Sequence, residues 1–85
     1  MTSLTPTDRD IAITGQVTTI WQRALHLDGE VPRDADFASL GGDSLLLLSI
    51  MDEVEETFGV ELDVDAVIAD LTVPGMVRAV LAAGD

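Results

Sequence analysis

The stretch SLLLLSIMDEVEETF, residues 44–58, follows the pair Gly41 and Gly42 and precedes Gly59. Its apolar residues recur at spacings of three and four, which is typical of a helix with one buried face. Glycine adopts the left-handed conformation that commonly ends a helix, so Gly59 is the predicted stop. The stretch therefore predicts a helix that begins near Ser44, and the rest of the chain must cover its apolar face.

This helix has more apolar residues than one face can bury. At about 100° per residue, with Leu47 as the origin, the core face is predicted to contain Leu47, Ile50, Met51, Val54 and Phe58. Leu46 and Leu48 fall near the borders of that face, about 100° to either side, and Leu45 falls at about 160°. We therefore expect Leu45 to face water, where an apolar side chain can anchor a partner.

The residues before this helix predict another helix and a long loop. Residues 7–27 have helical spacing, with Thr7 or Asp8 as the expected cap and aspartates in the first turn. The predicted core positions of that helix are Ile13, Val17, Ile20, Trp21 and Ala24. Residues 28–43 contain glycine, proline and aspartate, and they predict an ordered loop. The loop is expected to be held by Val31, Phe37 and Leu40, and a loop of this length in a small domain is usually functional.

Two further helices are predicted after Gly59. Residues 63–71 predict a short helix, and residues 72–83 predict a last helix capped by Thr72, with Pro74 tolerated in its first turn. No segment alternates with the period of a strand. The predicted fold class is all-α, a small antiparallel four-helix bundle that forms one domain over residues 1–85, with an ordered core of about residues 8–83.

The composition narrows the classes of function. The 85 residues include 16 acidic residues, four arginines, no lysine and no cysteine, and the formal net charge is −12. This charge disfavours nucleic acids and anionic lipids, and it attracts basic protein surfaces. The absence of cysteine excludes disulfides and thiolate metal sites. No apolar run reaches the roughly 18 residues of a membrane span, and the N-terminus lacks the pattern of a signal peptide, so we expect a cytoplasmic monomer.

The acidic residues are unevenly distributed. Residues 34–70 contain eleven aspartates and glutamates and no lysine or arginine, and Ser44 lies within them. A basic partner is therefore expected at this part of the surface. The alternative is that the acidity serves only to keep a leucine-rich domain soluble, and the two interpretations are compatible.

Ser44 admits three interpretations. In the first, Asp43 or Ser44 caps the helix, and the glycines form the turn before it. The second is a hydrolytic nucleophile, because GDSL is also the signature of a class of lipases and esterases. A nucleophilic serine needs a nearby base. The one imidazole of the chain, His26, lies at the end of the first predicted helix, where a surface residue is expected. We therefore reject the hydrolase interpretation. In the third, Ser44 is a substrate that carries a phosphodiester at the helix start, and the glycines let another enzyme approach.

Other ligand sites are not supported. No GK[ST] sequence follows the glycines, which excludes a phosphate-binding P-loop. Residues 63–74, DVDAVIADLTVP, have carboxylates at the first and third places of a calcium loop, but they lack the central glycine and the closing glutamate. No metal is predicted. Trp21 lies at a core position and is expected to pack in the interior.

Four segments together resemble the family of carrier proteins that bear 4′-phosphopantetheine, which includes acyl carrier proteins and peptidyl carrier (thiolation) domains. They are IWQRALHL (20–27), DADFASLGGDSL (34–45), EVEETFGVEL (53–62) and LTV (71–73). The resemblance implies that a phosphopantetheinyl transferase, with coenzyme A and magnesium, joins the arm to Ser44. It also implies that the terminal thiol of the arm holds an acyl or aminoacyl group as a thioester. The cofactor thus brings its own sulfur, and the carrier is not itself an enzyme.

The resemblance also implies the residues around the attachment site. Those that support the attachment motif are Gly41, Gly42, Asp43 and Leu45. Those expected to form the partner surface are Asp43, Leu45, Leu46, Ser49, Asp52, Val67 and Ile68. The expected partners are the transferase, an adenylation or acyl-loading enzyme, and condensation, tailoring or thioesterase enzymes.

The subclass has features of both branches. The paired glycines in FASLGGDSL, residues 37–45, are more similar to peptidyl carriers, whereas the overall acidity and Asp43 are similar to free-standing acyl carriers. Many synthetase-embedded thiolation domains have basic residues where this helix has Ser49, Asp52 and Glu53. The expected function is a discrete carrier of aminoacyl or peptidyl intermediates in nonribosomal peptide synthesis. The alternatives are a domain excised from a synthetase, an acyl carrier of polyketide or fatty acid synthesis, and an unmodified helical adaptor.

Overall fold

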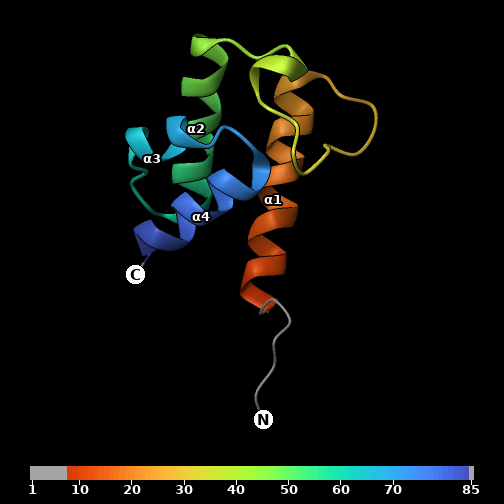
Figure 1. Ribbon diagram of the computed structural model, residues 1–85. Helices are drawn as coiled ribbons and strands as arrows, with labels where there is room; N and C mark the ends of the chain where they lie inside the picture. Colours follow the sequence, from red (N-terminus) through yellow and green to blue (C-terminus); the bar gives the residue numbers. More distant parts are fainter. Residues whose placement is uncertain (1–7, 85) are drawn as a thin grey trace.

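The computed structural model describes residues 8–84, which form four α-helices and one short 3₁₀ helix (Figure 1). In chain order these are α1 (Asp8–Leu25), η1 (Ala38–Leu40), α2 (Ser44–Phe58), α3 (Val64–Ala69) and α4 (Val73–Gly84). Helices α1 and α2 run in opposite directions, so α2 begins at the end of the molecule opposite to the start of α1 (Figure 1). The predicted all-α class, the long loop and the short third helix are confirmed, whereas η1 was not predicted.

The core is built around α1, which contacts both α2 and α4. Trp21 is fully buried, its indole N–H donates to Sδ of Met76 at 3.2 Å, and its ring lies edge-on to Phe37 with centroids 5.3 Å apart. The buried apolar residues are Ile13, Val17, Ile20, Trp21, Val31, Phe37, Ile50, Met51, Val54, Leu62, Val67, Val73, Met76, Val77, Ala79 and Val80. Trp21 is therefore a core residue, as predicted, and Ala24 packs against the core while partly exposed.

Helix α2 buries a narrower face than the sequence predicts. Ile50, Met51 and Val54 are buried, but Leu47 and Phe58 only pack against the core as partly buried residues. Both lie in the terminal turns of α2, where the rest of the bundle covers the helix less completely. The outward placement of Leu45 is confirmed, because 79% of its surface is exposed.

The helix ends follow local capping rules. Gly59 has a φ of 65° and donates its N–H to the carbonyl of Glu55 at 2.8 Å, which confirms it as the stop of α2. Thr72 caps α4 as predicted, since its Oγ1 accepts the N–H of Gly75 at 3.1 Å. His26 is exposed directly after α1 and has a φ of 56°. For the start of α1, the alternative cap Thr7 lies outside the described residues.

The loop between α1 and α2 is held by the three predicted apolar side chains. Val31 and Phe37 are buried, and Leu40 packs against the core. The backbone N–H of Phe37 also donates to the carbonyl of Leu71, between α3 and α4, at 2.8 Å. The loop is thus fixed to the connection between α3 and α4. Among the described residues, none of the helices has the length and apolarity needed to cross a bilayer.

Candidate functional site

The site begins with the turn that starts α2. Asp43 has extended backbone angles, and its carboxylate accepts the N–H of Leu46 at 2.8 Å. Asp43 is therefore the N-cap, and Ser44 is the first residue of the helix. Of the two residues that the sequence offered as caps, Asp43 is therefore the cap, because the Ser44 side chain makes no capping hydrogen bond.

The Ser44 side chain is exposed and available for chemistry. Within residues 8–84 its hydroxyl has no hydrogen-bond partner, and the same holds for the backbone N–H groups of Ser44 and Leu45. Free N–H groups and the positive end of the helix dipole favour an anion at this position. The exposed Ser44 oxygen is therefore accessible, and the start of α2 favours an anion joined to it.

The two glycines before Asp43 have different roles. Gly41 has a φ of 94°, a left-handed conformation that ends η1, and a Cβ there would meet no atom within 4 Å. Gly42 lies against the ring of Phe37, and a Cβ there would come within 2.2 Å of Cε2. Gly42 is therefore required by packing inside the chain, a reason that the sequence does not reveal.

Exposed apolar side chains lie on α2 and α3. Leu45 is 79% exposed, and Leu48, Val64 and Ile68 are each about half exposed. Sequence reasoning proposed Leu45 and Ile68 for a partner surface, but it omitted Leu48 and Val64. Leu48 fell on the border of the helical wheel, and Val64 lies four residues before Ile68, a spacing that places both on one side of a helix.

One residue predicted for the partner surface is in the core. Val67 has no exposed surface, so it cannot contact a partner while the chain is folded. The reason is its position in α3, where Val67 faces the core while Val64 and Ile68 face outward. The other predicted surface residues are at least partly exposed: Asp43, Leu45, Leu46, Ser49, Asp52 and Ile68.

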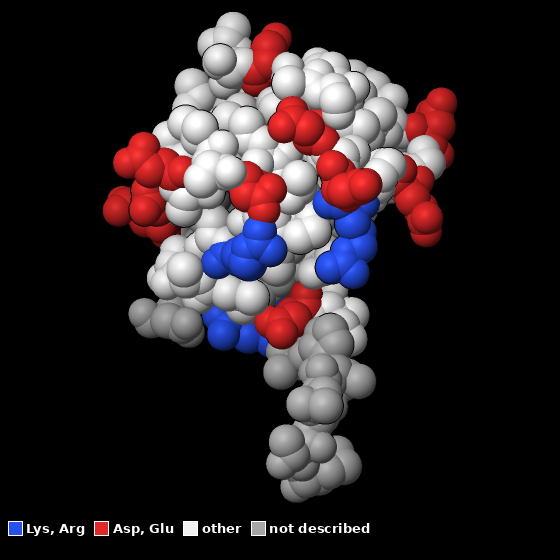
Figure 2. Space-filling model, in the orientation of Figure 1, with Lys and Arg blue, Asp and Glu red and all other residues white. Residues whose placement is uncertain are grey.

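The charges around the site remain strongly acidic. Arg23 pairs with Glu53 and Arg78 pairs with Asp70, so two of the eleven acids of residues 34–70 have an arginine partner from outside that stretch. Figure 2 shows the arginines in the middle and lower part of the displayed face, whereas most of the acidic side chains lie above them or at the edges. Both ion pairs are solvent-exposed and contribute little to stability.

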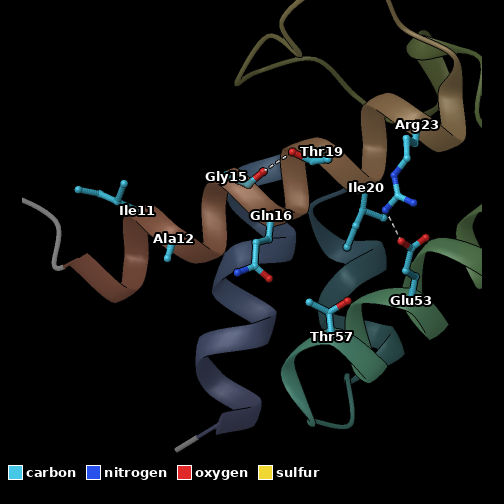
Figure 3. Close-up of a pocket in the computed structure, with 9 residues that line it drawn as sticks. All are labelled: Ile11, Ala12, Gly15, Gln16, Thr19, Ile20, Arg23, Glu53 and Thr57. Carbon is cyan, nitrogen blue, oxygen red and sulfur yellow. Dashed lines mark hydrogen bonds and ion pairs between the residues drawn. The ribbon is translucent and has the colours of Figure 1, made fainter.

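Two grooves lie away from Ser44. The first, of about 530 Å³, runs between α1 and α2, and the Arg23–Glu53 pair crosses one end of it (Figure 3). Its lining residues are Ile11, Ala12, Gly15, Gln16, Thr19, Ile20, Arg23, Glu53 and Thr57. The second, of about 430 Å³, lies between α1, α4 and the long loop. Neither groove is lined by Ser44 or His26, so Ser44 is presented on the surface and not inside either groove.

Known proteins resemble this chain in sequence and in fold. Residues 15–80 match the family described as phosphopantetheine attachment site. The fold is similar to that of BlmI, a type-II acyl carrier protein from Streptomyces verticillus involved in bleomycin biosynthesis, with a TM-score of 0.81 and 34% identity over 91% of this chain and 92% of that one. It is also similar to the PaxA T1-CDD/PaxB NDD docking-domain complex of the Pax NRPS, with a TM-score of 0.76 and 26% identity over 98% of this chain and 76% of that one.

A further relative is a much longer protein. Over 52 residues the chain is 44% identical to the non-reducing polyketide synthase ustP of Ustilaginoidea virens. The match covers 61% of this chain and 2% of the synthase. The chain therefore spans only a small part of the length of this relative.

Proposed function

Because the chain belongs to the phosphopantetheine attachment-site family, and is a carrier protein for covalent 4′-phosphopantetheine, we propose that Ser44 is the residue that bears this group. The observation that carries the proposal is the exposed Ser44 hydroxyl, free of hydrogen bonds within residues 8–84, at the start of a helix that Asp43 already caps. When bound, the group supplies a terminal thiol that holds an acyl or aminoacyl group as a thioester. Carrier domains of this family are generally non-catalytic, and we propose the same for this chain.

The attachment reaction needs an external enzyme. A phosphopantetheinyl transferase holds coenzyme A and magnesium, and the Ser44 oxygen forms a bond to the phosphorus of the phosphopantetheine half. The bond from that phosphorus to the adenosine bisphosphate half breaks, and the hydroxyl proton of Ser44 leaves to a base of the transferase. The carrier contributes an accessible oxygen and a helix start that favours the resulting anion.

The proposed cargo is an aminoacyl or peptidyl intermediate of nonribosomal peptide synthesis. Two observations support this choice: the glycine pair before Asp43, and the similarity to the PaxA T1-CDD/PaxB NDD complex of the Pax NRPS. The similarity to a polyketide synthase over 52 residues favours a second candidate, an acyl carrier of polyketide synthesis. Incubation of the modified carrier with adenylating enzymes and, separately, with malonyl transferases separates the two. Exclusive malonyl loading would overturn the first choice.

The proposed partner surface consists of Asp43, Leu45, Leu46, Ser49, Asp52 and Ile68. Leu45 and Ile68 supply exposed apolar area, and the aspartates supply negative charge, which suits brief contacts with basic surfaces. The proposed partners are the transferase, a loading enzyme, and the condensation, tailoring or thioesterase enzymes that use the cargo. A carrier must leave each enzyme after transfer, so a few apolar contacts with charge steering suit it better than a large interface.

Intact mass after incubation with a transferase, coenzyme A and magnesium tests the assignment of Ser44. Wild type is expected to gain one phosphopantetheine group, and Ser44→Ala is expected to gain none. Ser39→Ala is the matched control, because Ser39 is also an exposed serine, lies in η1 outside the proposed partner surface, and should leave modification unchanged. A Ser44→Ala chain that still gained the group, or a wild type that gained none, would contradict the proposal.

A further inference from the structure

Phe37 holds the turn before Ser44 with three of its groups. Its N–H donates to the carbonyl of Leu71 at 2.8 Å, and its carbonyl accepts the N–H groups of Leu40 at 3.2 Å and Gly42 at 3.1 Å. Phe37 is buried, with 2% of its surface exposed, and its ring lies edge-on to the ring of Trp21 in the core. One residue therefore joins the turn to α1 and to the connection between α3 and α4.

The ring of Phe37 also sets how closely the turn can approach the core. A Cβ at Gly42 would lie 2.2 Å from Cε2, 2.4 Å from Cζ and 2.5 Å from Cδ2 of the ring. A larger residue at position 42 must move the backbone and ring apart by at least 0.8 Å to reach 3.0 Å, and by 1.2 Å to reach the ordinary contact distance of 3.4 Å. The ring is packed in the core, whereas Gly41, Asp43 and Ser44 are exposed, so we expect the turn to be displaced and not the ring.

The position of Gly42 influences that of Ser44 through the backbone. Only Asp43 separates the two residues, and its carboxylate and carbonyl bind the N–H groups of Leu46 and Leu47 at 2.8 and 2.9 Å. The Ser44 hydroxyl has no hydrogen bond within residues 8–84 to hold it in place, so the region that the oxygen can reach follows the backbone of Ser44. A displacement at Gly42 therefore moves the start of α2 and the oxygen with it.

We propose that Phe37 is a positioning residue for modification of Ser44, which it places through contact with Gly42. This inference rests on the proposed function of Ser44. Group transfer depends steeply on geometry, and a displacement of about 1 Å can lower a rate by roughly 100-fold. Phe37 lies beneath the turn and needs no contact with the transferase for this role.

The test is steady-state modification of Gly42→Ala by a transferase with coenzyme A and magnesium, with the carrier as the varied substrate. We expect kcat to fall at least about tenfold, because the oxygen is misplaced within the bound complex. A purely structural role predicts a different result: if part of the carrier is unfolded, the apparent KM rises and kcat at saturation is unchanged. An unchanged kcat would therefore overturn the inference. Gly15→Ala is the matched control, because a Cβ at that helical glycine meets no atom within 4 Å.

A second set of variants covers the case in which Gly42→Ala does not fold. Phe37→Leu keeps an apolar side chain but removes the ring, and it is expected to lower kcat severalfold. In Gly42→Ala with Phe37→Leu, the new methyl group takes space that the ring has left, so the double variant should have a higher kcat than the product of the single effects predicts. A wild-type kcat in folded Phe37→Leu would contradict the positioning role. Failure of wild type to be modified would instead contradict the proposed function, so the two failures are distinguishable.

Discussion

Replacement of Leu45 by aspartate is expected to separate folding from partner binding. Full burial of a leucine contributes about 1.5–3 kcal/mol to stability. Because Leu45 is 79% exposed, folding buries only about a fifth of its surface, and the substitution removes roughly 0.3–0.6 kcal/mol of stability. An aspartate in the first turn recovers about 0.3–1 kcal/mol through the helix dipole. We therefore expect the free energy of unfolding to change by less than about 1 kcal/mol.

The same exposed area is what a partner can bury. If a partner covers it, loss of the leucine costs about 1.2–2.4 kcal/mol of binding, which is roughly a 10- to 50-fold weaker complex. The measurements are urea unfolding, and titration of the carrier with a transferase or loading enzyme. Ile11→Asp is the matched control, because Ile11 is 60% exposed in the first turn of α1, at the opposite end of the molecule (Figure 1). A loss of stability above about 2 kcal/mol, or equal weakening by both variants, would refute this view of Leu45.

Two further sets of substitutions test the assignment of the helix cap and the placement of Val67 in the core. Asp43→Ala removes the cap on Leu46 and should lower the free energy of unfolding by about 1 kcal/mol in urea titration, whereas Ser44→Ala should leave it nearly unchanged. The reverse order would mean that Ser44 is the cap. Val67→Ala opens a space in the core and should cost about 2 kcal/mol in the same titration, while binding of partners to the folded chain stays at the wild-type level. Weaker binding without loss of stability would mean that Val67 contacts partners after all.

The sequence predicted well wherever local chemistry decides the structure. Gly59 and Thr72 mark helix ends through their own backbone preference or side chain, so their roles followed from residue type and position. The outward placement of Leu45 followed from periodicity, because a helix of four turns defines its faces clearly.

Predictions failed where the outcome depends on packing between distant segments. Val67 belongs to a helix of six residues, too short for periodicity to identify the buried side without the rest of the fold. The role of Gly42 depends on the ring of Phe37, whose position is set by Trp21 and Leu71. Sequence reasoning gave the glycine pair two possible roles, to form the turn before the helix or to let another enzyme approach, and it had no means to recognise the close packing of Gly42.

The contact of Trp21 with Met76 and Phe37 has a practical consequence for spectroscopy. The chain has one tryptophan and no tyrosine, so its near-ultraviolet emission comes essentially from a single buried indole. That indole touches α4 through the Met76 sulfur and the loop before α2 through the Phe37 ring. A shift of the emission to longer wavelength would mean that water has reached this junction. The protein thus contains an intrinsic fluorophore that reports whether the loop leading to Ser44 is seated.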